Sequence, residues 1–125
     1  IAGFPTESDA AFANSADLID EAGLAYLHVF PYSPREGTPA ARMPQVPVGI
    51  RKQRAALLRQ RAAAALDRFL ASRVGVQASI LVEQAGIGRD ETYAPVVLPV
   101  EHGKGSIIHA RIAAARDGKL WLEAA

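Results

Sequence analysis

Residues 27–44 read Leu-His-Val-Phe-Pro-Tyr-Ser-Pro-Arg-Glu-Gly-Thr-Pro-Ala-Ala-Arg-Met-Pro, an apolar run followed at once by a proline-rich loop. The apolar run is typical of a strand. Each of the four prolines fixes φ and removes an amide donor, so the loop can be neither helix nor central strand. The loop also carries tyrosine and serine hydroxyls and two arginines. The stretch therefore predicts a stiff loop after a strand end, where binding groups are expected.

The residues before this loop predict a helix near 9–22. Apolar residues recur there at helical spacing, and Gly23 supplies a stop signal. Thr6 and Asp9 have the Thr-x-x-Asp spacing that resembles a capping box, so we expect the helix to begin there.

Strands are predicted on both sides of that helix, at residues 1–5 and 25–30. The second strand is apolar on both faces apart from His28, which we expect to be a core residue. A strand, helix and strand in this order form a parallel βαβ unit, which cannot cover both faces of its own sheet. Residues 1–46 are therefore predicted to be the terminal βαβ piece of a larger α/β, TIM-like barrel.

Residues 47–74 predict a linking helix that is strongly basic. Residues 46–74 carry seven Lys or Arg and one Asp, whereas the whole chain has a net charge of +1. Arg54, Arg61 and Arg68 recur every seven residues beside an apolar face. Two interpretations stay open, a solvated helix face and a surface that follows an RNA backbone.

Residues 75–125 predict an all-β domain. From Val76 the apolar period changes from 3.6 to 2, and Asp117-Gly118 is a strong hairpin signal. Four or five short strands without a helix predict a small closed barrel of the oligonucleotide-binding type. Trp121, the single tryptophan, is predicted to lie in its core.

The composition excludes several kinds of site. The chain has no cysteine, which excludes disulfides, thiolate nucleophiles and cysteine-held metal clusters within it. It has no apolar stretch of membrane-spanning length, so no membrane partner is expected. It opens on Ile1 as though within a strand, and we interpret it as a fragment of a longer protein.

Three motifs follow one another in an order typical of one enzyme family. They read Gly-Phe-Pro-Thr-Glu at 3–7, Leu-His-Val-Phe-Pro-Tyr-Ser-Pro-Arg at 27–35 and Gly-Thr-Pro-Ala-Ala-Arg-Met-Pro-Gln-Val at 37–46. Over essentially all 125 residues the chain resembles the C-terminal third of the radical SAM methylthiotransferases. The second motif is most similar to the branch that modifies N6-threonylcarbamoyladenosine next to the tRNA anticodon. The ribosomal-protein branch typically has acids where Arg35 stands.

The resemblance implies a fold, a reaction and cofactors. It implies the end of a radical SAM barrel followed by a TRAM domain, a small β-barrel that grips RNA. The reaction would add a methylthio group to C2 of the adenine, using S-adenosylmethionine and two 4Fe-4S clusters. The cluster cysteines lie upstream in the family, so this fragment should be inactive alone and should need the missing N-terminal part. The partner would be the tRNA anticodon arm, in the cytoplasm.

The resemblance also implies a cofactor site at the first motif. In radical SAM barrels this strand end lies against the adenosyl part of the cofactor. The residues carried over are Gly3, Phe4, Pro5 and Glu7. The alternative is a turn with a capping acid. The commoner family turn has Gly where Thr6 stands and Thr where Ser8 stands, so its geometry here can differ.

A substrate site is expected on the proline loop. Its polar residues, which could orient a nucleotide, are Tyr32, Ser33, Arg35 and Thr38. Arg35 could bind the threonylcarbamoyl carboxylate with two parallel hydrogen bonds. The alternative is that Arg35 pairs with Glu36 or a nearby aspartate and only fixes the loop.

RNA contacts are expected on the C-terminal domain. The residues able to stack on bases or meet phosphates are Arg89, Tyr93, Lys104 and Arg111. The alternative is an ordinary polar barrel surface, which the weak net charge of this domain also fits. Two rival functions stay open, a free-standing TRAM-type RNA-binding module and a methylthiotransferase acting on a ribosomal protein.

Overall fold

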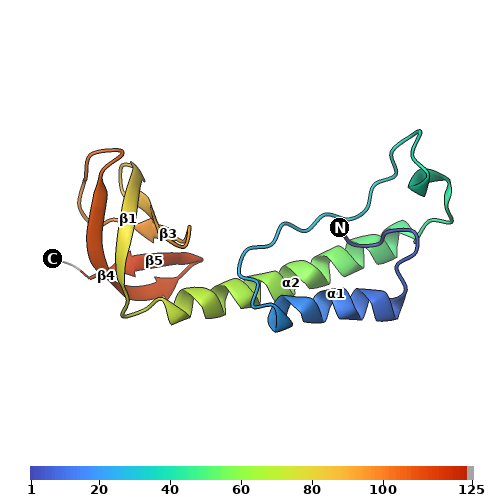
Figure 1. The fold of residues 1–125 in the computed structure, drawn as a ribbon, viewed down its shortest axis with the longest axis horizontal. Coiled ribbons are helices and arrows are strands. Elements are labelled where there is room, and N and C mark those ends of the chain that lie inside the picture. Colours follow the sequence, from blue (N-terminus) through green and yellow to red (C-terminus); the bar gives the residue numbers. More distant parts are fainter. Residues whose placement is uncertain (124–125) are drawn as a thin grey trace. The chain divides into compact units, whose positions relative to one another are not determined.

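The computed structural model describes residues 1–123 and divides the chain into two compact units, Ile1–Leu66 and Asp67–Ala125. Two α-helices come first, α1 at Asp9–Glu21 and α2 at Val48–Ser72, with a short 3-10 turn η1 at Ala40–Arg42 between them (Figure 1). Five strands follow α2. Because α2 continues past Leu66, it contributes residues to both units.

The first unit is built on the contact between α1 and the N-terminal part of α2. Small and apolar residues at helical spacing form its core, namely Ala16 and Ile19 from α1 with Ala55 and Leu58 from α2. The helix near 9–22 is therefore confirmed. Its cap differs from the prediction, because Ser8 and not Thr6 accepts the Ala11 N–H, at 3.1 Å.

The two strands predicted in the first unit are reduced to one parallel bridge, between Ala2 and Pro31. Ala2 donates to the Phe30 carbonyl at 2.9 Å, and Tyr32 donates to the Ala2 carbonyl at 2.7 Å. The parallel direction agrees with a βαβ unit, but no larger α/β barrel is present in the described residues. His28 is exposed, so its predicted core position is wrong. The reason is that Leu27 and Val29 face the helices, and the alternating residues point away from them.

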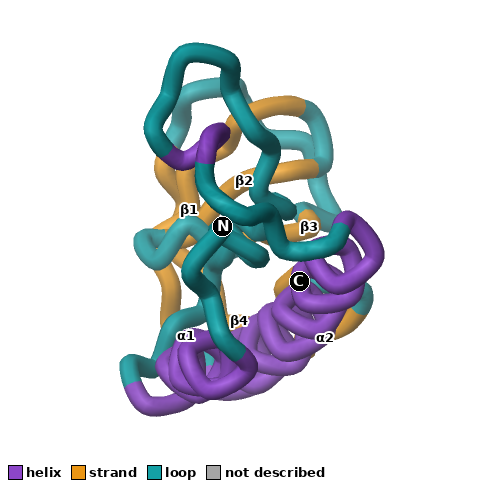
Figure 2. The backbone as a smooth tube through the Cα atoms, turned by 90° about the vertical axis from the view of Figure 1, so that its right-hand side faces the viewer, coloured by secondary structure: helices purple, strands orange, loops and turns teal. Residues whose placement is uncertain are grey.

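The proline-rich stretch lies in a long loop between α1 and α2. Apart from η1 and the bridge residue Pro31, residues 22–47 have no regular secondary structure, and Figure 2 shows them as a continuous irregular path. Two arginines of α2 hold this loop by its backbone, Arg51 at the Tyr32 carbonyl and Arg59 at the Val29 carbonyl. The loop is thus fastened to the helix that follows it.

The second unit is a closed five-stranded barrel. Its strands are β1 at Gln77–Gln84, β2 at Ile87–Asp90, β3 at Pro95–Val97, β4 at Ile107–Arg116 and β5 at Lys119–Leu122. They pair in the order β1-β2-β3-β5-β4 and back to β1, with β3 and β5 parallel and all other pairs antiparallel. The predicted small closed strand barrel is confirmed, and it is consistent with a TRAM-like domain.

The barrel interior follows from the alternation of apolar residues along the strands. Ala78, Ile80 and Val82 of β1 are buried, and the residues between them are exposed. Asp117 and Gly118 have φ of 52° and 68°, as a tight hairpin turn between β4 and β5 requires. Trp121 is only half-buried and lies under the Arg116 guanidinium, 4.1 Å from it. Its predicted core position is therefore wrong, since its neighbour Leu120 fills the interior.

Candidate functional site

The first motif forms a turn that closes on itself. The Gly3 N–H donates to Glu7 Oε1 at 2.8 Å, and the Glu7 N–H donates to the Phe4 carbonyl at 2.8 Å. Gly3 has a φ of +82°, and a Cβ atom there would lie 2.3 Å from Cγ of Arg51. Only glycine fits, because the backbone is left-handed and the Arg51 side chain crosses directly over it.

Arg51 connects this turn to the proline loop. It is 9% exposed, passes over Gly3 and donates from one terminal nitrogen to the Tyr32 carbonyl at 2.9 Å. Its Nε is buried and has no hydrogen-bond partner within residues 1–123. Arg51 therefore fixes the backbone on both sides of the bridge between Ala2 and Pro31.

Arg54, about one helical turn after Arg51 on α2, binds the same turn. Its guanidinium pairs with Glu7 and Asp9, both at 2.7 Å, and lies over the Phe12 ring. Burial disfavours the charged form, but the hydrogen bonds to Asp9 and Glu7 outweigh it, so the pKa of Arg54 is raised. Arg54 faces neither water nor RNA, which corrects both interpretations of this residue. No local pattern in the sequence indicates an ion pair between residues 45 or more positions apart.

An open hollow of about 640 Å3 lies between the turn and the loop. All four residues predicted to bind the substrate line it, together with Phe4 from the first motif. The Phe4 and Tyr32 rings meet edge to face, with centroids 5.4 Å apart. The remaining wall is mainly apolar and includes Ile1, Phe30, Pro31 and Ala40. Gly3, Pro5 and Glu7 are not among the lining residues.

Three polar groups of the hollow differ in what is left for a ligand. The Arg35 guanidinium is exposed and forms no ion pair with any residue of 1–123, so the alternative of an internal pair with Glu36 is wrong. The Tyr32 hydroxyl is buried without a hydrogen-bond partner in this part of the chain. The Thr38 hydroxyl is already used, since it donates to the Arg35 carbonyl and accepts from the Ala41 N–H. The hollow could thus hold a flat apolar group that carries an anionic substituent.

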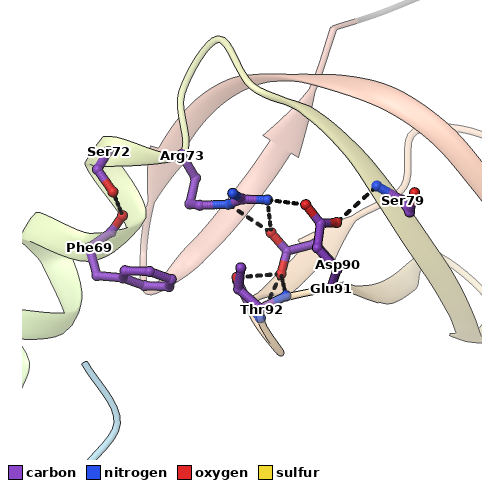
Figure 3. Close-up of polar contacts among 8 residues, drawn as sticks. Phe69, Ser72, Arg73, Ser79, Asp90, Glu91 and Thr92 are labelled. Carbon is purple, nitrogen blue, oxygen red and sulfur yellow. Dashed lines mark hydrogen bonds and ion pairs between the residues drawn. The ribbon is translucent and has the colours of Figure 1, made fainter. Parts of the chain in front are cut away.

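The second unit has a buried carboxylate at the end of β2 (Figure 3). Asp90 accepts from the Thr92 hydroxyl and from the N–H groups of Thr92 and Ala94, at 2.6 to 3.0 Å. Arg73, just after α2, donates to Asp90 at 3.0 Å and to Glu91 at 2.6 Å. Burial alone would raise the pKa of Asp90, but these hydrogen bonds and the Arg73 charge lower it below its ordinary value. The sequence analysis did not identify this cluster.

The four predicted RNA-binding residues do not form one cluster. Arg89 of β2 is paired with Glu83 and donates to the Tyr93 carbonyl at 3.0 Å. Arg89 pairs with Leu81 of β1, whereas Arg111 of β4 pairs with Gln77 of β1. These two positions on β1 are four residues apart, which corresponds to about 13 Å along the strand. Lys104 is exposed in the loop before β4. Neither Lys104 nor Arg111 has an ion pair within residues 1–123.

Two other kinds of site are absent from residues 1–123. No three His, Cys, Asp or Glu side chains come close enough together to hold a metal ion. Neither described helix has the length and apolar character needed to cross a membrane.

Comparisons with known proteins give relatives of one kind, although no protein-family model matches the chain. It is 48% identical over 118 residues, 94% of its length, to a threonylcarbamoyladenosine tRNA methylthiotransferase of Rickettsia prowazekii. Over 83 residues, 66% of its length, it is 45% and 42% identical to tRNA-2-methylthio-N(6)-dimethylallyladenosine synthases of Coxiella burnetii and Legionella pneumophila. The chain spans 28% of the length of the first relative and 19% of the other two.

Proposed function

Since the chain is a homologue of the tRNA methylthiotransferases over their C-terminal part, we propose that it belongs to a radical SAM enzyme of this kind. The substrate would be N6-threonylcarbamoyladenosine next to the anticodon, and the reaction would add a methylthio group to C2 of its adenine. The higher identity and longer match to the threonylcarbamoyladenosine enzyme support this substrate over dimethylallyladenosine. The enzyme would act in the cytoplasm on the tRNA anticodon arm.

The observation that carries the proposal is the unpaired Arg35 guanidinium in an otherwise mainly apolar hollow. The threonylcarbamoyl group bears a carboxylate, and a guanidinium can bind a carboxylate with two parallel hydrogen bonds. The Tyr32 ring, whose hydroxyl is buried, lies against the Phe4 ring at the wall of the hollow. Phe4 and Phe30 supply an apolar wall on which a planar base could lie.

The residues of this chain fit S-adenosylmethionine in part and the 4Fe-4S clusters not at all. Without cysteine, the chain supplies no thiolate for a 4Fe-4S cluster, so both clusters would be held by the remainder of the protein. For S-adenosylmethionine, Phe4 lines the hollow and could contact the adenosyl group. Gly3, Pro5 and Glu7 would act by shaping the turn that presents Phe4, since the Glu7 carboxylate is bound to Gly3 and Arg54.

The barrel would hold the RNA. Lys104 and Arg111 offer unpaired charges to phosphates, and Arg89 and Tyr93 lie together at the end of β2. Contacts to phosphates make RNA affinity fall with salt. The logarithm of the binding constant falls by about 0.7 to 0.9 per contact for each tenfold rise in salt concentration. Replacing Lys104 or Arg111 by alanine should therefore make that fall less steep.

The test is an Arg35→Lys variant of the full-length protein, expressed in a strain that lacks its own copy. Lysine keeps the charge but loses the two-pronged geometry, so we expect a fall in the 2-methylthio nucleoside measured in tRNA by mass spectrometry. Arg42→Lys is the matched control, because Arg42 lies in the same loop but does not line the hollow.

Full modification with Arg35→Lys would remove Arg35 from the site. A deletion strain with unchanged tRNA nucleosides would refute the proposed activity itself. Loss of a methylthio group from a ribosomal protein in that strain would favour the rival substrate.

A further inference from the structure

Tyr93 combines backbone strain with unusual exposure. Within residues 1–123, only Tyr93 and Asp117 pair a side chain with a positive φ, and the φ of Tyr93 is 66°. Asp117 is explained by its Asp-Gly hairpin turn. Tyr93 takes the left-handed position that ends the three-residue hairpin loop between β2 and β3, and at 75% it is the most exposed large apolar residue in this range. The loop explains the left-handed backbone but not the choice of a bulky aromatic residue where glycine or asparagine is usual, and this choice points to a function of the side chain.

The surrounding structure does maintain it. The Tyr93 N–H donates to the Asp90 carbonyl at 3.0 Å, and the Asp90 N–H donates to the Ala94 carbonyl at 3.1 Å. The buried Asp90 carboxylate binds the backbone on either side of Tyr93, through the N–H groups of Thr92 and Ala94. Arg73 neutralises that carboxylate from the end of α2 (Figure 3). The loop is therefore locked, with Tyr93 at its exposed position.

The ring itself is free. It makes no hydrogen bond or ring contact with any residue of 1–123, and the Arg89 contact is to the Tyr93 carbonyl and not to the ring. Nothing in that range therefore explains why a large aromatic side chain stands there. The backbone of Tyr93 is already fixed and its side chain has only two torsions, so it loses little conformational freedom when a second planar group stacks on the ring.

The charges around Tyr93 disfavour a simple phosphate contact. Arg73 and Arg89 are both engaged with carboxylates, of Asp90, Glu91 and Glu83. The local charge is thus close to balanced, and attraction of a polyanion cannot be the main term there. Stacking, which is insensitive to salt, fits this position better.

We infer that Tyr93 is a preorganised stacking platform for one unpaired nucleobase, held in place by Asp90 and Arg73. Bases inside a duplex have no free face, so the platform selects single-stranded or looped RNA over duplex RNA. The inference rests on the proposed function for its partner, tRNA. It adds which residue reads an unstacked base and which residues position it.

The test compares Tyr93→Asn, Tyr93→Phe and Asp117→Asn in the full-length protein. The probes are a single-stranded oligoadenylate of about 12 nucleotides with a central 2-aminopurine, a duplex RNA of equal length and unmodified tRNA. Asparagine accepts the left-handed backbone but has no ring, so Tyr93→Asn should leave the Tm equal or higher. It should weaken binding of the oligoadenylate by about 5- to 150-fold, by the same factor at low and high salt.

The controls isolate the ring from the fold. Tyr93→Phe keeps the ring and should bind the oligoadenylate within about two-fold of the natural chain, with the same change in 2-aminopurine fluorescence. Asp117→Asn alters the other left-handed side chain and should change neither the affinity nor the fluorescence. Duplex RNA should respond to none of these variants.

Several outcomes would overturn the inference. Unchanged oligoadenylate binding by Tyr93→Asn would do so while leaving the proposed function intact, and a fall in Tm together with affinity would show a purely structural role. Failure of the unaltered protein to bind either oligoadenylate or tRNA would refute both. Stacking at Tyr93 without any methylthiolation of tRNA would refute the proposed function alone.

Discussion

Both units contain an arginine that binds two carboxylates, but this ion cluster has a different role in each unit. In each, an arginine on or just after α2 binds two carboxylates, the buried Arg54 with Glu7 and Asp9, and the half-buried Arg73 with Asp90 and Glu91. In the second unit this ion cluster lies at the end of β2, beside a sheet that closes on itself around buried side chains. In the first unit it supports a turn beside an open hollow, whose wall includes the exposed apolar side chains of Ile1, Phe4 and Phe30.

This difference shows how a fixed backbone can serve either stability or binding. The barrel buries the inward-facing apolar side chains of its strands against one another, so it gains hydrophobic free energy within its own fold. In the first unit, Arg51 and Arg59 donate hydrogen bonds to carbonyls of the loop, and Arg54 binds the turn through Glu7. Its apolar groups around the hollow stay available for a ligand.

The largest expected effect comes from removing the barrel arginine. Arg73→Ala would leave the Asp90 carboxylate, which is 0% exposed, buried without its counter-ion. Breaking such a pair typically costs about 3–5 kcal/mol. We expect that loss in the free energy of unfolding of the barrel, measured by urea denaturation and by hydrogen exchange of β1 and β2.

Arg61→Ala is the matched control for an exposed ion pair. Arg61 and Asp17 are both largely exposed, so its removal should cost no more than about 1 kcal/mol. Equal losses for Arg61→Ala and Arg73→Ala would mean that burial does not distinguish the two pairs.

The next effect concerns the turn in the first unit. Gly3→Ala places a Cβ against the Arg51 stem in a left-handed backbone, and together these should cost about 2–4 kcal/mol. Gly37→Ala is the control, since Gly37 has a φ of +84° but nothing within 4 Å of its missing Cβ, so only about 1–2 kcal/mol should be lost. Hydrogen exchange of α1 and α2 would measure the loss of stability in both variants. Identical losses would show that the Arg51 side chain moves aside from the new Cβ without a cost in free energy.

The smallest effect is a pH dependence confined to the barrel. The pKa of Asp90 is lowered in the folded chain from its ordinary value of 3.8, so the unfolded chain binds the proton more readily. The stabilisation is therefore complete above the ordinary value and is lost as the pH falls toward the folded-state pKa. Thermal unfolding of the natural chain between pH 6 and about pH 3 should show a falling Tm that is shallower in Asp90→Asn. Parallel curves would exclude Asp90 as a source of the acid sensitivity.

Local sequence patterns predicted most of the helices and strands but few of the contacts between residues distant in sequence. The helical period predicted α1 and α2, the period of two predicted the barrel, and Asp117-Gly118 predicted the hairpin. The strands at 1–5 and 25–30 were overestimated, because an apolar run reports burial potential and not the presence of a neighbouring strand. The polar residues of the proline loop predicted a site at Tyr32, Ser33, Arg35 and Thr38, and the structure places all four at one hollow, although their binding role stays a prediction.

The remaining misses concern partners distant in sequence. Arg54 looked like a surface residue because periodicity records only its own helix, whereas Glu7 and Asp9 lie more than forty positions away. The cluster of Arg73 and Asp90 was missed for the same reason. No spacing rule connects the end of a helix to the end of the second strand after it.

The crossing of Arg51 over Gly3 makes the sizes of these two residues interdependent during evolution. A bulkier residue at position 3 could be accommodated only if position 51 carried a shorter side chain, which would then give up its grip on the Tyr32 carbonyl. Substitutions at the two positions should therefore be correlated among related proteins. A designer who wished to reshape the hollow would have to exchange both residues together.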